Sequence, residues 1–300
     1  MNLESKSKVK NIGFIGLGIM GSRMAAHLLT PDFKLKVYNR SSEKAQKLVE
    51  GGATPTANLS DLAQGSDIII TMLSTPEVVR DSAFGNNGFI QKMDKGGIWI
   101  NCSTVNPTFS EEMCWLAQQS GVRFIDAPVA GTKGPAEAGE LLFLLGGEAE
   151  DIEEVAPLFE LMGKKYLRLG KAGKGSAMKM LINQLLAQST VAFVEAMVLG
   201  EAMGLKQETL FNVLTATPVV APVISGIRPK LESGDYDPNF SLKWIHKDLH
   251  LSSLTAYEKE VPLHNLGVTK ELFGQAKQNG FGDMDFSSIY EFMRNKESDL

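Results

Sequence analysis

Two hydrophobic patterns alternate along the first half of the chain. Short runs that are apolar on both faces occur at Asn11–Ile15, Lys34–Tyr38, Asp67–Leu73, Ile98–Asn101, Arg123–Asp126 and Leu141–Leu145. Amphipathic segments separate them, and we expect helices at Met20–Leu29, Ser42–Gly51 and Pro107–Ser120, with Ser41 or Ser42 capping the second. Such alternation predicts an α/β fold with a doubly wound parallel sheet that is covered by helices on both faces.

After about Gly170 the strand pattern stops and long helical patterns follow. They cover Ala177–Met203, Gln207–Ala216, Val223–Leu231, Lys247–Glu258 and Leu263–Asn279. We therefore predict a nucleotide-binding domain at residues 1–172 and an all-helical domain at residues 173–300. Residues 295–300 are expected to form a frayed tail.

Composition and charge narrow the class of protein. The chain has 300 residues, of which 43% are hydrophobic and 22% charged, and its net charge is −5. This charge argues against nucleic acid or an anionic membrane as the main partner. The polar N-terminus lacks the apolar run of a signal peptide, and the apolar stretch Ala177–Leu205 carries polar groups that would be costly in lipid. We expect a cytoplasmic protein whose Cys102 and Cys114 are small buried hydrophobes.

The strongest motif follows the first predicted strand. It reads Gly16-Leu17-Gly18-Ile19-Met20-Gly21 and leads directly into a helix. In a dinucleotide-binding fingerprint the first glycine makes a tight turn, the second lets the backbone approach the pyrophosphate, and the third allows close packing of helix and strand. The flanking strand, helix and second strand favour this interpretation over an ordinary glycine-rich turn.

The end of the second strand indicates which dinucleotide binds. NAD sites usually carry Asp or Glu here, whereas this chain reads Asn39-Arg40-Ser41. Because this chain has no carboxylate at that position, nothing there would repel the 2′-phosphate of NADP(H). Arg40 can pair with that phosphate or stack on adenine. We therefore expect NADP(H) to be preferred over NAD(H). The alternative is that Arg40 is simply a solvated charge beyond a strand.

Two more segments follow strands on the ligand side of the sheet. Leu73 ends one apolar run and is a candidate to pack on the cofactor, and Thr104 comes after the next run and is a candidate to bond near the nicotinamide ribose. Loop starts with helix caps are an equally good interpretation of both segments.

Lys179 and Asn183 are the catalytic candidates that the residues themselves suggest. They are four positions apart in an otherwise apolar helix, so they share one face. Reduction of a carbonyl builds negative charge on oxygen, which a lysine ammonium can stabilise and protonate. An ordinary lysine at a helix start remains the alternative.

Several ordered motifs give the chain a resemblance to a known family. They are the glycine motif, Cys102-Ser103-Thr104-Val105, Asp126-Ala-Pro-Val-Ala-Gly131, Gly173 to Asn183, and Phe240 followed by Lys247-Asp248-Leu249. From Asn11 to about Phe292 the chain resembles the β-hydroxyacid dehydrogenases, the group that contains 3-hydroxyisobutyrate dehydrogenase, tartronate semialdehyde reductase and glyoxylate/succinic semialdehyde reductase. The resemblance implies a Rossmann-like domain, a helical domain built on a long interdomain helix, and a homodimer or homotetramer.

The resemblance also implies roles for single residues. The family's catalytic lysine corresponds to Lys179 and its partner asparagine to Asn183. Its substrate loop corresponds to Val129–Thr132, its cofactor-contacting threonine to Thr104, and its lysine near the nicotinamide to Lys247. Intact Lys179 favours carbonyl and alcohol chemistry over imine reduction, and this chemistry needs no metal.

The substrate loop departs from the usual family pattern. A serine that helps bind the substrate carboxylate is replaced by Ala130, and the second glycine after it by Thr132. The backbone N–H groups around Ala130, Gly131 and Thr132 could still hold a carboxylate. The following residues look more like the glyoxylate/succinic semialdehyde reductase branch. We therefore expect an NADPH-dependent reductase of a short carboxylate-bearing aldehyde or keto acid, with a non-catalytic NADP-binding scaffold or sensor as the alternative.

Overall fold

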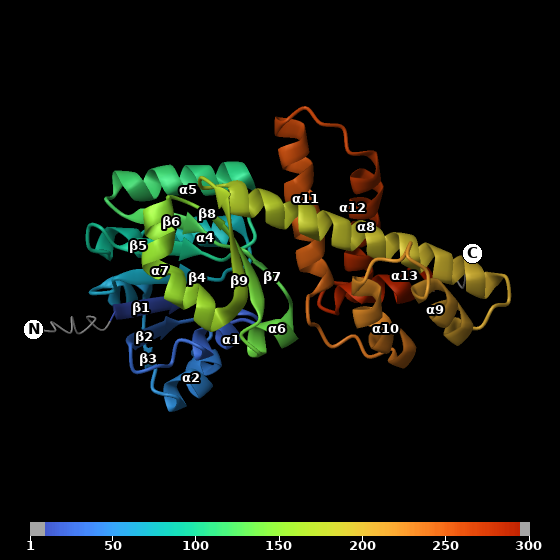
Figure 1. The fold of residues 1–300 in the computed structure, drawn as a ribbon, viewed down its shortest axis with the longest axis horizontal. Coiled ribbons are helices and arrows are strands. Elements are labelled where there is room, and N and C mark those ends of the chain that lie inside the picture. Colours follow the sequence, from blue (N-terminus) through green and yellow to red (C-terminus); the bar gives the residue numbers. More distant parts are fainter. Residues whose placement is uncertain (1–9, 295–300) are drawn as a thin grey trace, which may run out of the picture. The chain divides into compact units, whose positions relative to one another are not determined.

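The computed structural model describes residues 10–294, which fall into two compact units (Figure 1). The first unit ends at Lys179 and the second begins at Met180. This division falls inside the helix α8, Lys174–Ala202, whereas the change of sequence pattern at residues 172–173 lies just before that helix. The predicted tail at 295–300 and most of the polar N-terminal segment lie outside the described residues.

The first unit is built on a nine-stranded sheet with the strand order β3-β2-β1-β4-β5-β6-β8-β7, and β9 pairs with β8. From β3 to β6 all neighbouring strands are parallel. The strands are β1 Lys10–Ile15, β2 Phe33–Tyr38, β3 Thr54–Pro55, β4 Ile68–Thr71, β5 Ile98–Asn101, β6 Arg123–Asp126, β7 Val129–Ala130, β8 Leu141–Gly146 and β9 Gly163–Gly170.

Helices cover both faces of this sheet, which confirms the doubly wound α/β prediction. One face packs against α1 (Gly21–Ala26), α2 (Gln46–Glu50) and α7 (Ala149–Met162) around a buried cluster that includes Phe14 and Ile100. The other face packs against α3 (Leu59–Ala63), α4 (Pro76–Phe84) and α5 (Pro107–Gln119) around Trp99. Every residue of β4 and β5 is buried, as expected of strands between two helical layers.

The sheet edge beyond β6 differs from a simple parallel arrangement. β8 runs antiparallel to β6 and β7, and β9 then pairs parallel to β8. β9 was not predicted, because Lys164, Lys165 and Arg168 give this edge strand a largely polar surface. The predicted cap is also absent. Ser41 precedes a 3₁₀ turn at Ser42–Ala45, but its side chain makes no capping hydrogen bond.

The second unit is helical, as predicted. The remainder of α8 packs with α9 (Gln207–Thr215), α10 (Val223–Ser233), α11 (Leu242–Glu258), α12 (His264–Ala276) and α13 (Ile289–Arg294). Their core contains fully buried Val194, Phe211, Ile245, Leu249 and Phe273.

The 29-residue helix α8 is long and apolar enough to cross a membrane by length and composition alone. Its buried residues include the polar Asn183 and Thr190, and Ala187 and Val194 pack in the core of the second unit. Buried polar groups and a packed face are typical of a core helix in a globular protein, which is the interpretation that we favour.

Candidate functional site

The glycine-rich loop adopts the tight turn that the motif predicts. Gly16 has a φ of 98°, in the left-handed region, and its N–H donates to the carbonyl oxygen of Tyr38 at 3.0 Å. A Cβ on Gly16 would lie 2.3 Å from the backbone oxygen of Met72. Only glycine satisfies both conditions at this position.

The other two glycines meet opposite surroundings. A Cβ on Gly21 would lie 1.9 Å from the carbonyl oxygen of Gly16, so α1 can begin this close to the loop only with glycine. A Cβ on Gly18 would have no heavy atom within 4 Å. The open space is therefore on the Gly18 side of the loop, where a ligand can approach the backbone.

The loop also offers hydrogen-bond donors. Within the described chain, the backbone N–H groups of Gly18, Ile19 and Met20 donate to no protein acceptor. Free N–H groups at the start of a helix suit a diphosphate, because they point at the anion and the helix dipole favours negative charge. The residues present therefore fit the dinucleotide that the sequence predicts.

Asn39 holds the loop in place. Its Oδ1 accepts the N–H of Leu17 at 2.9 Å, and its Nδ2 donates to the carbonyl oxygen of Ser41 at 2.9 Å. Leu17 is buried by this arrangement, and the side chain of Arg40 is exposed. Asn39, Arg40 and Ser41 were predicted to meet a 2′-phosphate. Arg40 is the exposed cation among them, whereas the side chain of Asn39 is hydrogen-bonded to the backbone of Leu17 and Ser41.

A buried polar network fixes the loops after β4 and β5. The N–H of Leu73 donates to Ser103 Oγ at 2.9 Å, and Thr71 Oγ1 donates to Asn101 Oδ1 at 2.9 Å. Trp99 Nε1 donates to Thr71 Oγ1 at 2.9 Å. Half-buried Thr104 directly follows this network. Sequence reasoning identified Leu73 and Thr104 but missed the polar residues that join their loops.

The predicted substrate loop leaves the sheet at β7. Ala130 is the last residue of that strand, and Gly131 follows with a φ of 126° and its surface exposed. Thr132 precedes the short helix α6, Lys133–Glu137, without a side-chain capping bond. Gly131 therefore holds a backbone conformation that favours glycine, and this residue of the loop is exposed.

The predicted catalytic pair lies on α8. Lys179 is half-buried, and Asn183 is one turn further along and 2% exposed. In the second unit Asn183 Nδ2 donates to Asp248 Oδ2 at 2.6 Å, and Lys247 Nζ lies 2.7 Å from Asp248 Oδ1. Asp248, itself 2% exposed, thus joins two residues that the sequence predicted separately.

Asp248 is the main residue that sequence reasoning left without a role. A buried carboxylate is stable only with charged or hydrogen-bonded partners, and Asp248 has one of each. The available signal was its position on the same helix as apolar Ile245 and Leu249, where an acidic residue is unexpected.

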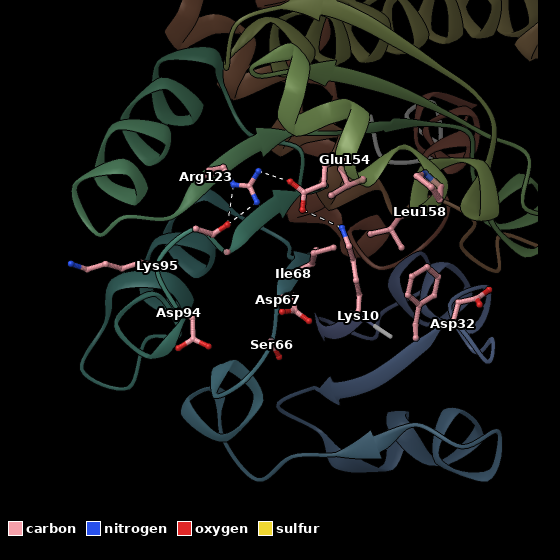
Figure 2. Close-up of a pocket in the computed structure, with 15 residues that line it drawn as sticks. Lys10, Asp32, Ser66, Asp67, Ile68, Asp94, Lys95, Arg123, Glu154 and Leu158 are labelled. Carbon is pink, nitrogen blue, oxygen red and sulfur yellow. Dashed lines mark hydrogen bonds and ion pairs between the residues drawn. The ribbon is translucent and has the colours of Figure 1, made fainter. Parts of the chain in front are cut away.

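A cavity of about 620 Å³ lies at the N-terminal ends of the parallel strands, opposite to the ends that carry the glycine-rich loop (Figure 2). Figure 2 shows Glu154 between Lys10 and Arg123, and its carboxylate oxygens lie 3.2 Å and 2.6 Å from these cations. Arg123 also donates to the carbonyl oxygen of Gly96. Lys10 and Arg123 are therefore paired within the protein, and the cavity lies at the end of the parallel strands opposite to the glycine-rich loop.

The two cysteines are free and not bonded to each other. Cys102 is fully buried, and burial holds its thiol pKa far above the usual range. Cys114 is half-buried, and its pKa is raised to about 11, first by burial and then by nearby carboxylates. Both are therefore neutral thiols near pH 7, in keeping with a structural role.

Comparison with known families agrees with this geometry over nearly the whole chain. Residues 11–170 match the NAD binding domain of 6-phosphogluconate dehydrogenase. Residues 173–293 match the NAD-binding domain of NADP-dependent 3-hydroxyisobutyrate dehydrogenase.

Individual relatives point the same way. The chain is 34% identical to glyoxylate/succinic semialdehyde reductase 1 of Arabidopsis thaliana over 283 residues, which is 94% of this chain and 98% of the relative. It is 34% identical to 3-sulfolactaldehyde reductase of Escherichia coli over 284 residues, 94% of this chain and 95% of the relative. A solved structure of Mycobacterium tuberculosis 3-hydroxyisobutyrate dehydrogenase with L-serine has a TM-score of 0.83 and 28% identity, covering 95% of this chain and 99% of that one. The chain thus belongs to the β-hydroxyacid dehydrogenase family of NAD(P)-dependent oxidoreductases.

Proposed function

We propose that this enzyme uses NADPH to reduce a short aldehyde or keto acid that carries an anionic group, and that it forms the corresponding hydroxy acid reversibly. The observation that carries the proposal is a half-buried lysine, Lys179, on a long helix of a protein whose glycine-rich loop has open space and free N–H donors for a dinucleotide.

The preference for NADPH rests on the end of β2. Asn39 stands where an NAD site usually has a carboxylate, and its side chain is bonded within the loop. Arg40 follows it with an exposed guanidinium, which can bind a phosphate through two parallel N–H donors. Both features favour a ligand with a 2′-phosphate over one with a free 2′-hydroxyl.

Lys179 is assigned the proton transfer. When bound, NADPH supplies the hydride that adds to the carbonyl carbon. The Lys179 ammonium donates a proton to the carbonyl oxygen, where negative charge develops, and takes it back in the reverse direction. Asn183 lies on the same helix face and is held by Asp248, so its amide is fixed for aligning the reacting group.

The anionic end of the substrate is assigned to the loop at Ala130, Gly131 and Thr132. The two curated relatives are named for a semialdehyde and for a sulfonated aldehyde, which are both short and anionic. Ala130 provides no hydroxyl, so binding depends on backbone N–H groups and on the side chains of Thr132 and Lys133.

We further propose that the protein is a homodimer or homotetramer in the cytoplasm. Exposed apolar side chains recur along α8 at heptad spacing, with Met178 38%, Leu185 64% and Leu199 61% exposed, and Leu181 at 53% beside them. An exposed row of apolar side chains on a long helix is suited to packing against the same helix of a second copy.

The test is the loss of NADPH absorbance with glyoxylate, succinic semialdehyde, tartronate semialdehyde, methylmalonate semialdehyde and 3-sulfolactaldehyde. Wild-type protein should turn over at least one of them. Lys179→Ala should bind NADPH normally but lose about 10²–10⁴ in kcat, as expected for removal of a general acid. Near-normal turnover by Lys179→Ala would refute this mechanism. Tight NADPH binding with no turnover across the panel would instead favour a sensor that retains the fold, an alternative to which the missing hydroxyl at Ala130 lends some support.

A further inference from the structure

Asp126, the last residue of β6, is fully buried and accepts two backbone hydrogen bonds from the start of α8. Its Oδ1 accepts the N–H of Gly173 at 3.0 Å, and its Oδ2 accepts the N–H of Ser176 at 2.7 Å. The N–H groups of a helix's first turn have no acceptor within the helix, so a carboxylate here satisfies them and complements the helix dipole. Lys179 lies three residues after Ser176, nearly one turn further along the same helix.

The surroundings of this carboxylate are shaped to hold it in one place. A Cβ on Gly146 would lie 2.1 Å from Asp126 Oδ1, and a Cβ on Gly175 would lie 3.0 Å from Oδ2 and 2.1 Å from the carbonyl oxygen of Leu144. The glycines therefore let the backbones of β8 and α8 close around Asp126. A side chain on either glycine would push these backbones away from the carboxylate.

Asp126 also begins the segment that leads to the predicted substrate loop. β7 starts at Val129, three residues later, and Gly131 follows it. One side chain therefore connects the strand that leads into the loop segment with the helix that carries Lys179. All of these residues belong to the first unit.

We propose that Asp126 is a positioning residue for proton transfer, which fixes Lys179 relative to the substrate loop by holding the first turn of α8 on the end of β6. The inference rests on the role proposed for Lys179. A displacement of about 1 Å between reacting groups can cost about 10²-fold in rate, so the anchoring of this turn has a direct effect on kcat.

The carboxyl of Asp126 titrates within the pH range of an ordinary activity assay. Burial raises the pKa of its carboxyl to about 6, while the hydrogen bonds from Ser176 and Gly173 act in the opposite direction. The other titratable groups on the segments packed around it are Glu111 and Cys114 on α5, Glu148 and Asp151 at the N-cap and first turn of α7, Lys171 in the turn before α8, and Lys174 at the start of α8. Cys114 stays neutral up to high pH, because burial and then the carboxylates of Asp126, Glu148 and Asp151 raise its thiol pKa to about 11.

The variant Asp126→Asn tests the proposal, because the amide has one acceptor oxygen where the carboxylate has two. We expect kcat to fall at least about tenfold, while the KM for NADPH stays within about twofold, since the glycine-rich loop is unchanged. In wild type, kcat should also decline as the pH falls from 7 towards 5, and this decline should be absent in Asp126→Asn.

Ser110→Ala is the matched control. It removes the buried hydrogen bond between Ser110 Oγ and Ser176 Oγ, 2.8 Å long, but leaves both N–H bonds to Asp126. We expect it to keep kcat within about threefold of wild type. A general loosening of the helix start would lower kcat in both variants and would overturn the specific role of the carboxylate.

Two further outcomes separate this inference from the proposed function. An inactive Lys179→Ala together with a fully active Asp126→Asn would overturn the inference alone. A fully active Lys179→Ala would overturn both. If Asp126→Asn does not fold, the wild-type profile decides, and a kcat that is constant from pH 7 to 5 would overturn the inference.

Discussion

Replacing Gly18 and Gly21 by alanine, one at a time, separates folding from cofactor binding in a loop of six residues. The added methyl group at Gly21 would lie 1.9 Å from the Gly16 carbonyl oxygen, so the loop and α1 must move apart by more than about 1 Å to restore an ordinary contact. Overpacking of this kind costs about 1–3 kcal/mol. For a protein of this size class that corresponds to a fall in Tm of about 2–12 °C.

The same substitution at Gly18 meets no protein atom within 4 Å. Alanine at a compatible glycine position leaves stability unchanged or raises it by up to about 1 kcal/mol. The methyl group does, however, occupy the space through which a diphosphate would approach the backbone. We therefore expect an unchanged or slightly higher Tm together with a Kd for NADPH at least about tenfold weaker, which corresponds to about 1.4 kcal/mol.

Thermal unfolding without ligand and fluorescence titration with NADPH measure the two effects on the same samples. An unchanged Kd in Gly18→Ala would refute the placement of the diphosphate at this loop. An unchanged Tm in Gly21→Ala would show that the loop can relax around a Cβ, and the packing argument would be wrong.

Four other expectations follow from the described contacts. Arg40→Asp should weaken NADPH binding far more than NADH binding, and an unchanged ratio of the two Kd values would remove the basis for the NADPH preference. Asp248→Asn should lower kcat by about tenfold or more, because Lys247 loses its ion-pair partner and the fixed position of the Asn183 amide is disturbed; unchanged kinetics would contradict this. Leu185→Gln should shift the sedimentation coefficient towards that of a monomer if the α8 stripe joins two copies. For Asp126 the folded pKa of about 6 exceeds the ordinary aspartate pKa of 3.8, so its contribution to stability is present below pH 3.8 and is lost as the pH rises through 6. At about 1.4 kcal/mol per pKa unit, Asp126→Asn should remove about 3 kcal/mol of the pH dependence of the unfolding free energy between pH 4 and 7, and an unchanged dependence in urea titrations would contradict this.

The parallel core of the sheet could be predicted because its hydrophobic pattern is unambiguous. β5 and β6 begin and end at the predicted residues, since strands buried on both faces have an apolar interior and end at polar residues where the loops start. β9 could not be predicted in this way. It lies at the sheet edge, pairs with β8, and exposes Lys164 and Lys165, so its sequence resembles a polar loop.

Part of the candidate site could likewise be predicted from the sequence, and part of it could not. Glycine spacing and single functional residues can be seen in a sequence, and the conformations of Gly16 and Gly21 agree with the roles predicted for them. Contacts between distant segments cannot be seen in this way. Asn183 and Asp248 are 65 positions apart and Asp126 and Ser176 are 50 apart, so only the folded backbone shows that each pair is bonded.

The bonds of Asn39 have a practical consequence for redesigning cofactor preference. Its side chain accepts from the N–H of Leu17 and donates to the carbonyl oxygen of Ser41, so its hydrogen bonds join the glycine-rich loop to the segment after β2. An Asn39→Asp exchange, the usual way to favour NAD, would keep the acceptor for Leu17 but remove the donor to Ser41. It would also place a negative charge beside the carbonyl oxygen of Ser41. Arg40 is exposed beside it and takes no part in these bonds. A programme of directed evolution should therefore find changes in nucleotide preference at Arg40 at little structural cost, and changes at Asn39 only together with compensating substitutions.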